Sequence, residues 1–344
     1  MIETVRWGIL GPGAIARTFA TAVDALDGHD VTATGSRDPE RARAFNVERG
    51  YAGAEAGTYA ELASSDAVDA VYVATPHSGH LEHAALALRQ GKAVLCEKPL
   101  AVNASEARAM CGIAKRHGVP LMEAMWSRFL PATRQAAGWL KAGAIGEPRR
   151  LVCSFGFEAP FDAKSRLFAP ELAGGSLLDI GCYTLSLAAL VFGEAVIGPE
   201  APELEVECEL APTGVDQHCD MTLRFPSGAE ARLESSISRQ RDHTAGIKGT
   251  EGNIEIHRFW RARRTVLYRG CQRVVTAELP FLANGFEYQI QEVERLLREG
   301  ATESRLLPHA ESIALLELMD EVRRRMGVRY PFESAIGVTE GVSV

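Results

Sequence analysis

The first third of the chain alternates short apolar runs with longer segments in which apolar residues recur at helical spacing. A run such as residues 70–74 is apolar at nearly every position, which is typical of strands covered on both faces. This alternation predicts βαβ units and a doubly wound parallel sheet of the α/β class. The predicted strands are residues 5–10, 31–34, 70–74, 93–96 and 120–125. The first predicted helix ends at Leu26, and the others span residues 39–49, 79–90 and 103–117.

The pattern changes after about residue 123, where strands begin to follow one another without intervening helices. Such a succession indicates a largely antiparallel sheet. Small or apolar and charged side chains alternate within residues 229–234, which predicts one packed face and one open face. The pattern predicts two domains, a first of residues 1–123 and a second, α+β domain of residues 124–344. The second domain is predicted to contain strands between about 204 and 268 and helices at 131–142, 175–192, 286–298 and 309–326. The last of these helices is able to pack back on the first domain.

Composition narrows the function classes. The chain has 344 residues and a net charge of −8, with Lys and Arg scattered, which argues against a nucleic-acid partner. The seven cysteines are widely spaced and odd in number, which fits a reducing cytoplasm better than a disulfide framework or zinc site. No basic and apolar leader follows Met1, and no eighteen apolar residues run together, so we expect neither export nor a membrane span.

A glycine-rich turn follows the first predicted strand and opens the first helix. Gly11-Pro12-Gly13-Ala14-Ile15-Ala16 matches G-x-G-x-x-A, a dinucleotide-binding pattern in this context. Gly11 permits the tight turn, Gly13 lets the backbone approach a pyrophosphate, and the N–H groups at Ala14 and Ile15 face the anion. A solely structural glycine turn is the alternative.

The end of the second strand, Ser36-Arg37-Asp38, indicates which cofactor is preferred. An NAD site would place an acid here for the ribose hydroxyls, but Asp38 comes one residue late and precedes Pro39. We therefore interpret Asp38 as a helix N-cap. Arg37, with Ser36 beside it, is suited to a 2′-phosphate, so NADP is predicted in preference to NAD.

Thr75-Pro76-His77 ends the next strand, and His80 and His83 follow on a helix. Three histidines at a spacing of three invite a metal interpretation, but no carboxylate or cysteine joins them at ligand spacing. We expect Thr75, Pro76 and His77 to line the nicotinamide end of the cofactor site, and we count His80 among the cofactor-binding residues.

Glu97-Lys98-Pro99 lies at the end of a predicted parallel strand, where the following loop begins. Ligands of open α/β sheets collect at the carboxyl ends of strands, so we expect Glu97 and Lys98 at the cofactor. Taken alone, a Lys-Pro at a strand exit is more often an ordinary solvated loop.

Asp179 and Tyr183 lie one helical turn apart, so a carboxylate and a phenol are predicted to share a helix face. A neighbouring ammonium and an oxidised nicotinamide would both favour the phenolate. A buried tyrosine whose hydroxyl is satisfied by Asp179 is the structural alternative.

These motifs together resemble the glucose-fructose oxidoreductase / inositol dehydrogenase family over nearly the whole chain. The residues that carry the resemblance are Gly11-Pro12-Gly13, Ala74-Thr75-Pro76-His77, Glu97-Lys98-Pro99, the run 174–183 and Gly249-Thr250-Glu251-Gly252. Residues 122–129 and a tyrosine at 183 are similar to the dimeric dihydrodiol dehydrogenase and NADP-dependent xylose dehydrogenase members.

The resemblance implies a Rossmann domain, an open sheet that often mediates dimers, and a catalytic lysine and tyrosine matching Lys98 and Tyr183. It also suggests Trp126 and Arg128 near cofactor and substrate. Trp126 offers an apolar face to a sugar or diol ring. Phe155 and Phe157 are candidate further walls, with core packing the better interpretation for at least one of them.

We therefore predict reversible hydride transfer between NADP, or NAD, and a secondary alcohol carbon of a pyranose or a cyclic trans-diol. Tyr183 would move the hydroxyl proton, Lys98 would stabilise the alkoxide-like oxygen, and Asp179 would orient the pair. The roles of Lys98 and Tyr183 are interchangeable at this point, with a neutral lysine as the base. Two other functions stay open, a glycosidase or lyase that uses NAD transiently and a non-catalytic NADP-binding regulator.

Overall fold

The computed structural model describes residues 4–198, 202–270 and 272–333 and divides the chain into two compact units. The first unit runs to Arg134 and adds Trp260–Arg264 and Glu278–Ile313, and the second comprises Gln135–Phe259, Thr265–Ala277 and residues from Ala314 onward. The functional domain boundary at residue 123 stays a prediction. Cys271 and the first three residues lie outside the described residues.

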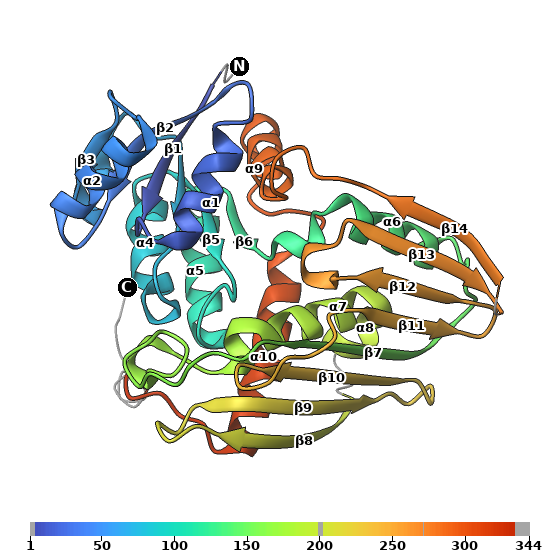
Figure 1. Cartoon of the computed structure of the whole chain (residues 1–344). Helices are drawn as coiled ribbons and strands as arrows, with labels where there is room; N and C mark the ends of the chain where they lie inside the picture. Colours follow the sequence, from blue (N-terminus) through green and yellow to red (C-terminus); the bar gives the residue numbers. More distant parts are fainter. Residues whose placement is uncertain (1–3, 199–201, 271, 334–344) are drawn as a thin grey trace. The chain divides into compact units, whose positions relative to one another are not determined.

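The first unit is built on a parallel six-stranded sheet in the order β3-β2-β1-β4-β5-β6 (Figure 1). Its strands β4 and β5 are buried along their whole length, and every residue in them except Glu97 is apolar or aromatic, as expected for strands covered on both faces. The doubly wound α/β prediction is confirmed. The elements are β1 Val5–Leu10, α1 Ala14–Val23, β2 His29–Gly35, α2 Pro39–Arg49, β3 Glu55–Gly57, α3 Tyr59–Ser64, β4 Ala70–Val73, α4 His80–Arg89, β5 Ala93–Glu97, α5 Ala104–His117, β6 Leu121–Ala124 and α9 Glu287–Glu299.

The starts of α2 and α5 follow from capping residues in the sequence. Asp38 caps α2 by accepting the Glu40 N–H at 3.0 Å, with Pro39 in the first turn, which confirms its predicted structural role. Asn103 caps α5 in the same way through the Glu106 N–H. The helix α1 ends at Val23 and not at Leu26, because the next residues form i to i+3 bonds that tighten the last turn.

The second unit is built on an eight-stranded sheet in the order β14-β13-β12-β11-β7-β10-β9-β8 (Figure 1). Its described pairings are antiparallel except for β7 with β10, and α7 packs on these two strands. In β10, Ala231 and Leu233 are buried while Arg232 is exposed, as the alternation predicts. The elements are α6 Pro131–Lys141, β7 Pro148–Gly156, α7 Cys182–Phe192, α8 Glu194–Ile197, β8 Glu203–Leu210, β9 Asp216–Arg224, β10 Glu230–Ser236, β11 Ala245–Gly249, β12 Asn253–His257, β13 Arg264–Arg269, β14 Gln272–Glu278 and α10 His309–Met326.

One stretch of the second unit, Pro170–Phe192, is long and apolar enough to cross a membrane by length and composition alone. Its most apolar window is 89% buried inside the chain, which is how a core helix behaves. This stretch is not the regular helix that the sequence predicts. It contains a π-helical turn, Leu177–Gly181, which leads directly into α7.

Candidate functional site

The glycine turn after β1 has the features that a pyrophosphate needs. Gly11 has φ +89°, and a Cβ on it would lie 2.9 Å from the Ala74 carbonyl oxygen, so only glycine fits against the loop after β4. A Cβ on Gly13 would meet only the Gly11 oxygen, at 4.0 Å. The start of α1 at Ala14 has no side-chain cap and no acidic residue in its first turn. Open space beside uncapped N–H groups is suited to an anion.

The loop after β2 presents a cation. Ser36 is buried and accepts the Asp38 N–H, and the Asp38 carboxylate is engaged in capping α2. Arg37 lies between them with an exposed side chain. This arrangement favours binding of a phosphate over hydrogen bonding to two ribose hydroxyls.

His80 joins the loops that follow β4 and β5. The ring is fully buried, with Nε2 3.0 Å from the Thr75 oxygen and Nδ1 2.9 Å from the Pro99 oxygen. Burial lowers the pKa of His80 to about 4, so the neutral ring donates its one N–H to one of these carbonyls. The fully buried ring, held between two carbonyls, supports these loops, and the cofactor contact of His80 stays a prediction.

The other histidines of this region are also held locally. His83 Nδ1 lies 2.9 Å from the Thr75 hydroxyl, and the His77 ring lies 5.6 Å from the His80 ring. His83 thus contacts the Thr75 side chain, whereas the His77 and His80 rings lie edge to face against each other. Thr75, Pro76 and His77 remain predicted contacts of the nicotinamide side.

Buried side chains hold the backbone on both sides of Lys98. Glu97 accepts the Tyr72 hydroxyl hydrogen at 2.5 Å and the Lys98 N–H at 3.3 Å. On the other side, Glu123 accepts the Leu100 N–H at 3.1 Å. Burial raises the pKa of Glu123. The sequence predicted Lys98 but not this support, and Glu97 is engaged with Tyr72 in it.

Trp126 and Arg128 follow β6 and are both buried. The Trp126 ring packs 4.8 Å from Phe286 and 6.0 Å from Trp260. Arg128 forms an ion pair with Glu311 and donates a hydrogen bond to the Leu306 oxygen at 3.2 Å. Their contacts with cofactor and substrate stay predictions. The acid partner was missed because it lies 183 residues away in sequence.

In the second unit, the π-helical turn and α7 carry Asp179 and Tyr183, and both side chains are buried. Arg166 donates to Asp179 Oδ1 at 2.7 Å while keeping 59% of its own side chain exposed. The Tyr183 ring lies 5.8 Å from Phe155. Arg166 was missed by sequence reasoning because it stands in a loop with no periodic pattern.

An aromatic cluster surrounds Phe155 at the end of β7. Its ring lies 6.4 Å from Phe157, 5.0 Å from His243 and 6.4 Å from Phe259. Phe155 is buried and Phe157 half-buried, so the two predicted walls divide into one core residue and one partly accessible residue. Nothing in the local pattern identified His243 or Phe259.

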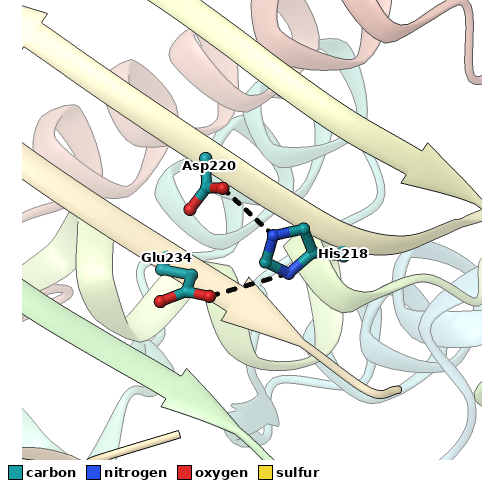
Figure 2. A group of neighbouring side chains, drawn as sticks. All are labelled: His218, Asp220 and Glu234. Atoms are coloured by element: carbon teal, nitrogen blue, oxygen red, sulfur yellow. Dashed lines mark hydrogen bonds and ion pairs between the residues drawn. The ribbon is translucent and has the colours of Figure 1, made fainter. Parts of the chain in front are cut away.

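A separate polar cluster lies on β9 and β10. Figure 2 shows the His218 ring between two carboxylates, with Nε2 3.0 Å from Asp220 Oδ2 and Nδ1 3.8 Å from Glu234 Oε1. The same Glu234 oxygen is paired with the Arg241 guanidinium. We interpret the group as a network of close polar contacts and assign it no part in the candidate site.

Of the predicted site residues, the glycine turn, Arg37 and Lys98 belong to the first unit, and Asp179 and Tyr183 belong to the second. Comparisons with known proteins identify the family of the chain. Two family models match it, "Oxidoreductase family, NAD-binding Rossmann fold" over residues 5–125 and "GFO/IDH/MocA C-terminal domain" over residues 133–255.

Individual proteins give the same result. The trans-1,2-dihydrobenzene-1,2-diol dehydrogenase of Mus musculus is 36% identical over 341 residues, covering 95% of this chain and 98% of that protein. Among solved structures, a 3-ketoreductase from Actinomadura kijaniata in complex with NADP and TDP-benzene is 28% identical, with a TM-score of 0.81 over 93% of this chain and 97% of that one. An aldose-aldose oxidoreductase from Caulobacter crescentus, complexed with glycerol, is 26% identical, with a TM-score of 0.82 over 94% and 98%.

The sequence resemblance is therefore confirmed along nearly the full length. Both halves of the chain match, and the glycine turn, Lys98 and Tyr183 lie within the matched ranges. The chain belongs to the glucose-fructose oxidoreductase / inositol dehydrogenase (GFO/IDH/MocA) family of oxidoreductases.

Proposed function

We propose that this oxidoreductase is an NADP-dependent dehydrogenase that transfers hydride reversibly between NADP and a secondary alcohol carbon of a cyclic trans-diol or a pyranose. The observation that carries the proposal is the near full-length likeness to a named diol dehydrogenase. The likeness to a sugar oxidoreductase supports the pyranose as the second substrate class.

The residues of the first unit fit a dinucleotide. The gap at Gly13 and the uncapped start of α1 suit its pyrophosphate, and Arg37 suits a 2′-phosphate. The cofactor would supply the hydride acceptor. The chain's own part is to bind and orient it and to move the hydroxyl proton.

Proton transfer is assigned to the second unit. Tyr183 would take the proton from the substrate hydroxyl, and the Lys98 ammonium would stabilise the negative charge that develops on that oxygen. Asp179, held by Arg166, would orient the pair. With Lys98 and Tyr183 exchanged, a neutral lysine would be the base, and the pH profiles of the variants discussed below separate the two assignments.

We also propose that the chain forms a homodimer, or a higher homo-oligomer, through the open face of the second sheet and works in the cytoplasm on a small-molecule substrate. Exposed outward side chains such as Arg232 and Val152 support such a face. None of the six cysteines in the described ranges forms a disulfide, and a reducing compartment is compatible with this. Light scattering of the purified chain tests the assembly.

A substrate panel tests the function. Aldoses, polyols and cyclic diols are incubated with NADP or NAD, and the absorbance of the reduced nicotinamide is followed. We expect net NADPH formation with a cyclic trans-diol or an aldopyranose. Release of sugar without any lasting change in that absorbance would instead indicate a transient redox lyase, and no turnover with any member of the panel would contradict the proposal.

Filling the gap at Gly13 tests the cofactor site. Gly13→Val is expected to raise the Kd for NADPH by about tenfold or more, because the side chain would displace the pyrophosphate from the helix N–H groups. The backbone at Gly13 has φ −96°, which any residue adopts, so the fold should be kept, and the melting temperature should fall only slightly because valine is a poorer helix N-cap than glycine. Fluorescence titration with NADPH measures the effect.

The matched control is Gly53→Val, at an exposed turn where an added Cβ meets nothing within 4 Å. Equal NADPH affinities of the two variants would place the cofactor elsewhere.

A further inference from the structure

Asp216 is a buried carboxylate that the proposed reaction does not use. It begins β9 and has no exposed surface. Its Oδ2 accepts hydrogen bonds from the Ser176 hydroxyl at 2.8 Å and from the Leu177 N–H at 2.7 Å. Asp216 therefore holds the residues at which the π-helical turn begins.

The carboxylate lies in a dense polar setting around residues 174–177. The Ser176 hydroxyl also lies 3.0 Å from the Ser235 hydroxyl of β10. Gly175 has φ +121°, and a Cβ on it would lie only 2.2 Å from Asp216 Oδ1, so the glycine makes room for the carboxylate. The Tyr330 hydroxyl donates to the Gly174 oxygen at 2.7 Å. Two strands and the segment after α10 thus fix this short run of backbone.

The run that Asp216 holds leads directly to two residues assigned to proton transfer. The Asp179 N–H donates to the Gly175 oxygen at 3.2 Å, and Tyr183 is the second residue of α7. Single π-helical turns occur frequently at functional sites. Since misplacing a catalytic group by about 1 Å reduces rates by about 100-fold, the anchoring of this turn bears on turnover.

The burial of Asp216 is unfavourable for folding. Desolvation raises its pKa to about 6, and Oδ1 has no hydrogen-bond partner. Since the pKa in the unfolded chain is lower, ionising Asp216 destabilises the fold as the pH rises through this range. A group that is unfavourable for stability at neutral pH is typical of a functional requirement.

We propose that Asp216 is a positioning residue whose ionised carboxylate holds the start of the π-helical turn and thereby orients Asp179 and Tyr183 for proton transfer. The inference rests on the proposed function. Protonation of Asp216 removes its negative charge and weakens both hydrogen bonds, so turnover is expected to fall as the pH drops through the pKa of this group.

Several other ionisable groups lie near Asp216. Burial raises the pKa values of the Cys208 and Cys219 thiols and of the Tyr330 hydroxyl, so these groups stay neutral at neutral pH. Arg323, which lies over the Tyr330 ring and pairs with Glu333 and Asp320, stays cationic. His218 lies two residues further along the same strand, outside the proposed site, and its replacement serves as a control.

The experiment compares the full-length wild type with Asp216→Asn and with the control His218→Gln. At about pH 8, Asp216→Asn should lower kcat by about tenfold or more, because one hydrogen bond and the charge are lost. NADPH binding should be unchanged, since the cofactor residues belong to the first unit. At about pH 5, where the wild-type carboxyl is protonated as well, the two kcat values should converge. His218→Gln should follow the wild-type profile.

A second variant, Ser176→Ala, keeps the test decisive where Asp216→Asn fails to fold. The Ser176 hydroxyl lowers the pKa of Asp216 by hydrogen bonding to its charged form. Its removal should therefore move the acid limb of the kcat profile to higher pH.

Several results would overturn the inference. These are a wild-type kcat for Asp216→Asn at about pH 8, a wild-type to variant ratio that is constant with pH, or an unmoved acid limb in Ser176→Ala. Absence of turnover in the wild type would overturn the proposed function and this inference together, whereas wild-type turnover with an unaffected variant overturns the inference alone.

Discussion

Replacing Lys98 with alanine is expected to lower kcat by about 100-fold or more while NADPH binds with nearly its original affinity. The ammonium is proposed to face the oxygen that gains negative charge in the transition state, so its removal acts on turnover and not on cofactor binding. The backbone at Lys98 is fixed by the neighbouring Glu97 and by Glu123, which accepts the Leu100 N–H. The loop should therefore keep its shape without the lysine side chain.

Tyr183→Phe is expected to have an effect of the same size, about 100-fold or more, because it removes the group that moves the proton. The phenyl ring keeps its packing against Phe155, so folding should be preserved. Measured across pH, the two variants also assign the base. If kcat rises with pH as the base ionises, the residue whose substitution abolishes this rise is the proton-transfer group.

Two replacements serve as matched controls. Lys92→Ala removes a lysine just before the amino end of β5, the strand that Lys98 follows, and Tyr268→Phe removes a hydroxyl that donates to Glu255 on β12. Both should retain nearly wild-type kcat. Full turnover in Lys98→Ala or Tyr183→Phe would remove that residue from the mechanism.

Much of the first unit could be predicted because its signals are local. An Asp-Pro pair starts α2, an asparagine starts α5, and a strand–glycine turn–helix succession positions Gly11 and Gly13. The physics of caps and turns acts within a few residues, so one short window of sequence contains it.

What the sequence did not reveal depends on pairs that are distant along the chain. The strand β7 was missed, because its central place comes from pairing with β10 and β11 about 80 to 100 residues later. The ion pair of Arg128 with Glu311 joins positions far apart, and the regular helix predicted around Asp179 is a π-helical turn held by Asp216. Local periodicity contains no information about such partners.

Arg37→Ala is expected to raise the Kd for NADPH by about 10- to 100-fold while the Kd for NADH changes little. The reason is that a guanidinium binds the 2′-phosphate through charge-assisted hydrogen bonds, whereas the ribose hydroxyl of NADH offers no charge. Asp38 cannot compensate by taking that hydroxyl, because its carboxylate caps α2. Fluorescence titration with each reduced cofactor measures both constants.

Two comparisons make the Arg37 test specific. Arg41→Ala removes an exposed arginine of α2 one turn further on and should leave both affinities unchanged. Raising the salt concentration should weaken NADPH binding to the wild type more than to Arg37→Ala, because a partly exposed ion pair is screened and a missing one is not. If Arg37→Ala weakened NADPH and NADH equally, the arginine would support the cofactor site as a whole, and the preference for NADP would have to arise from another group.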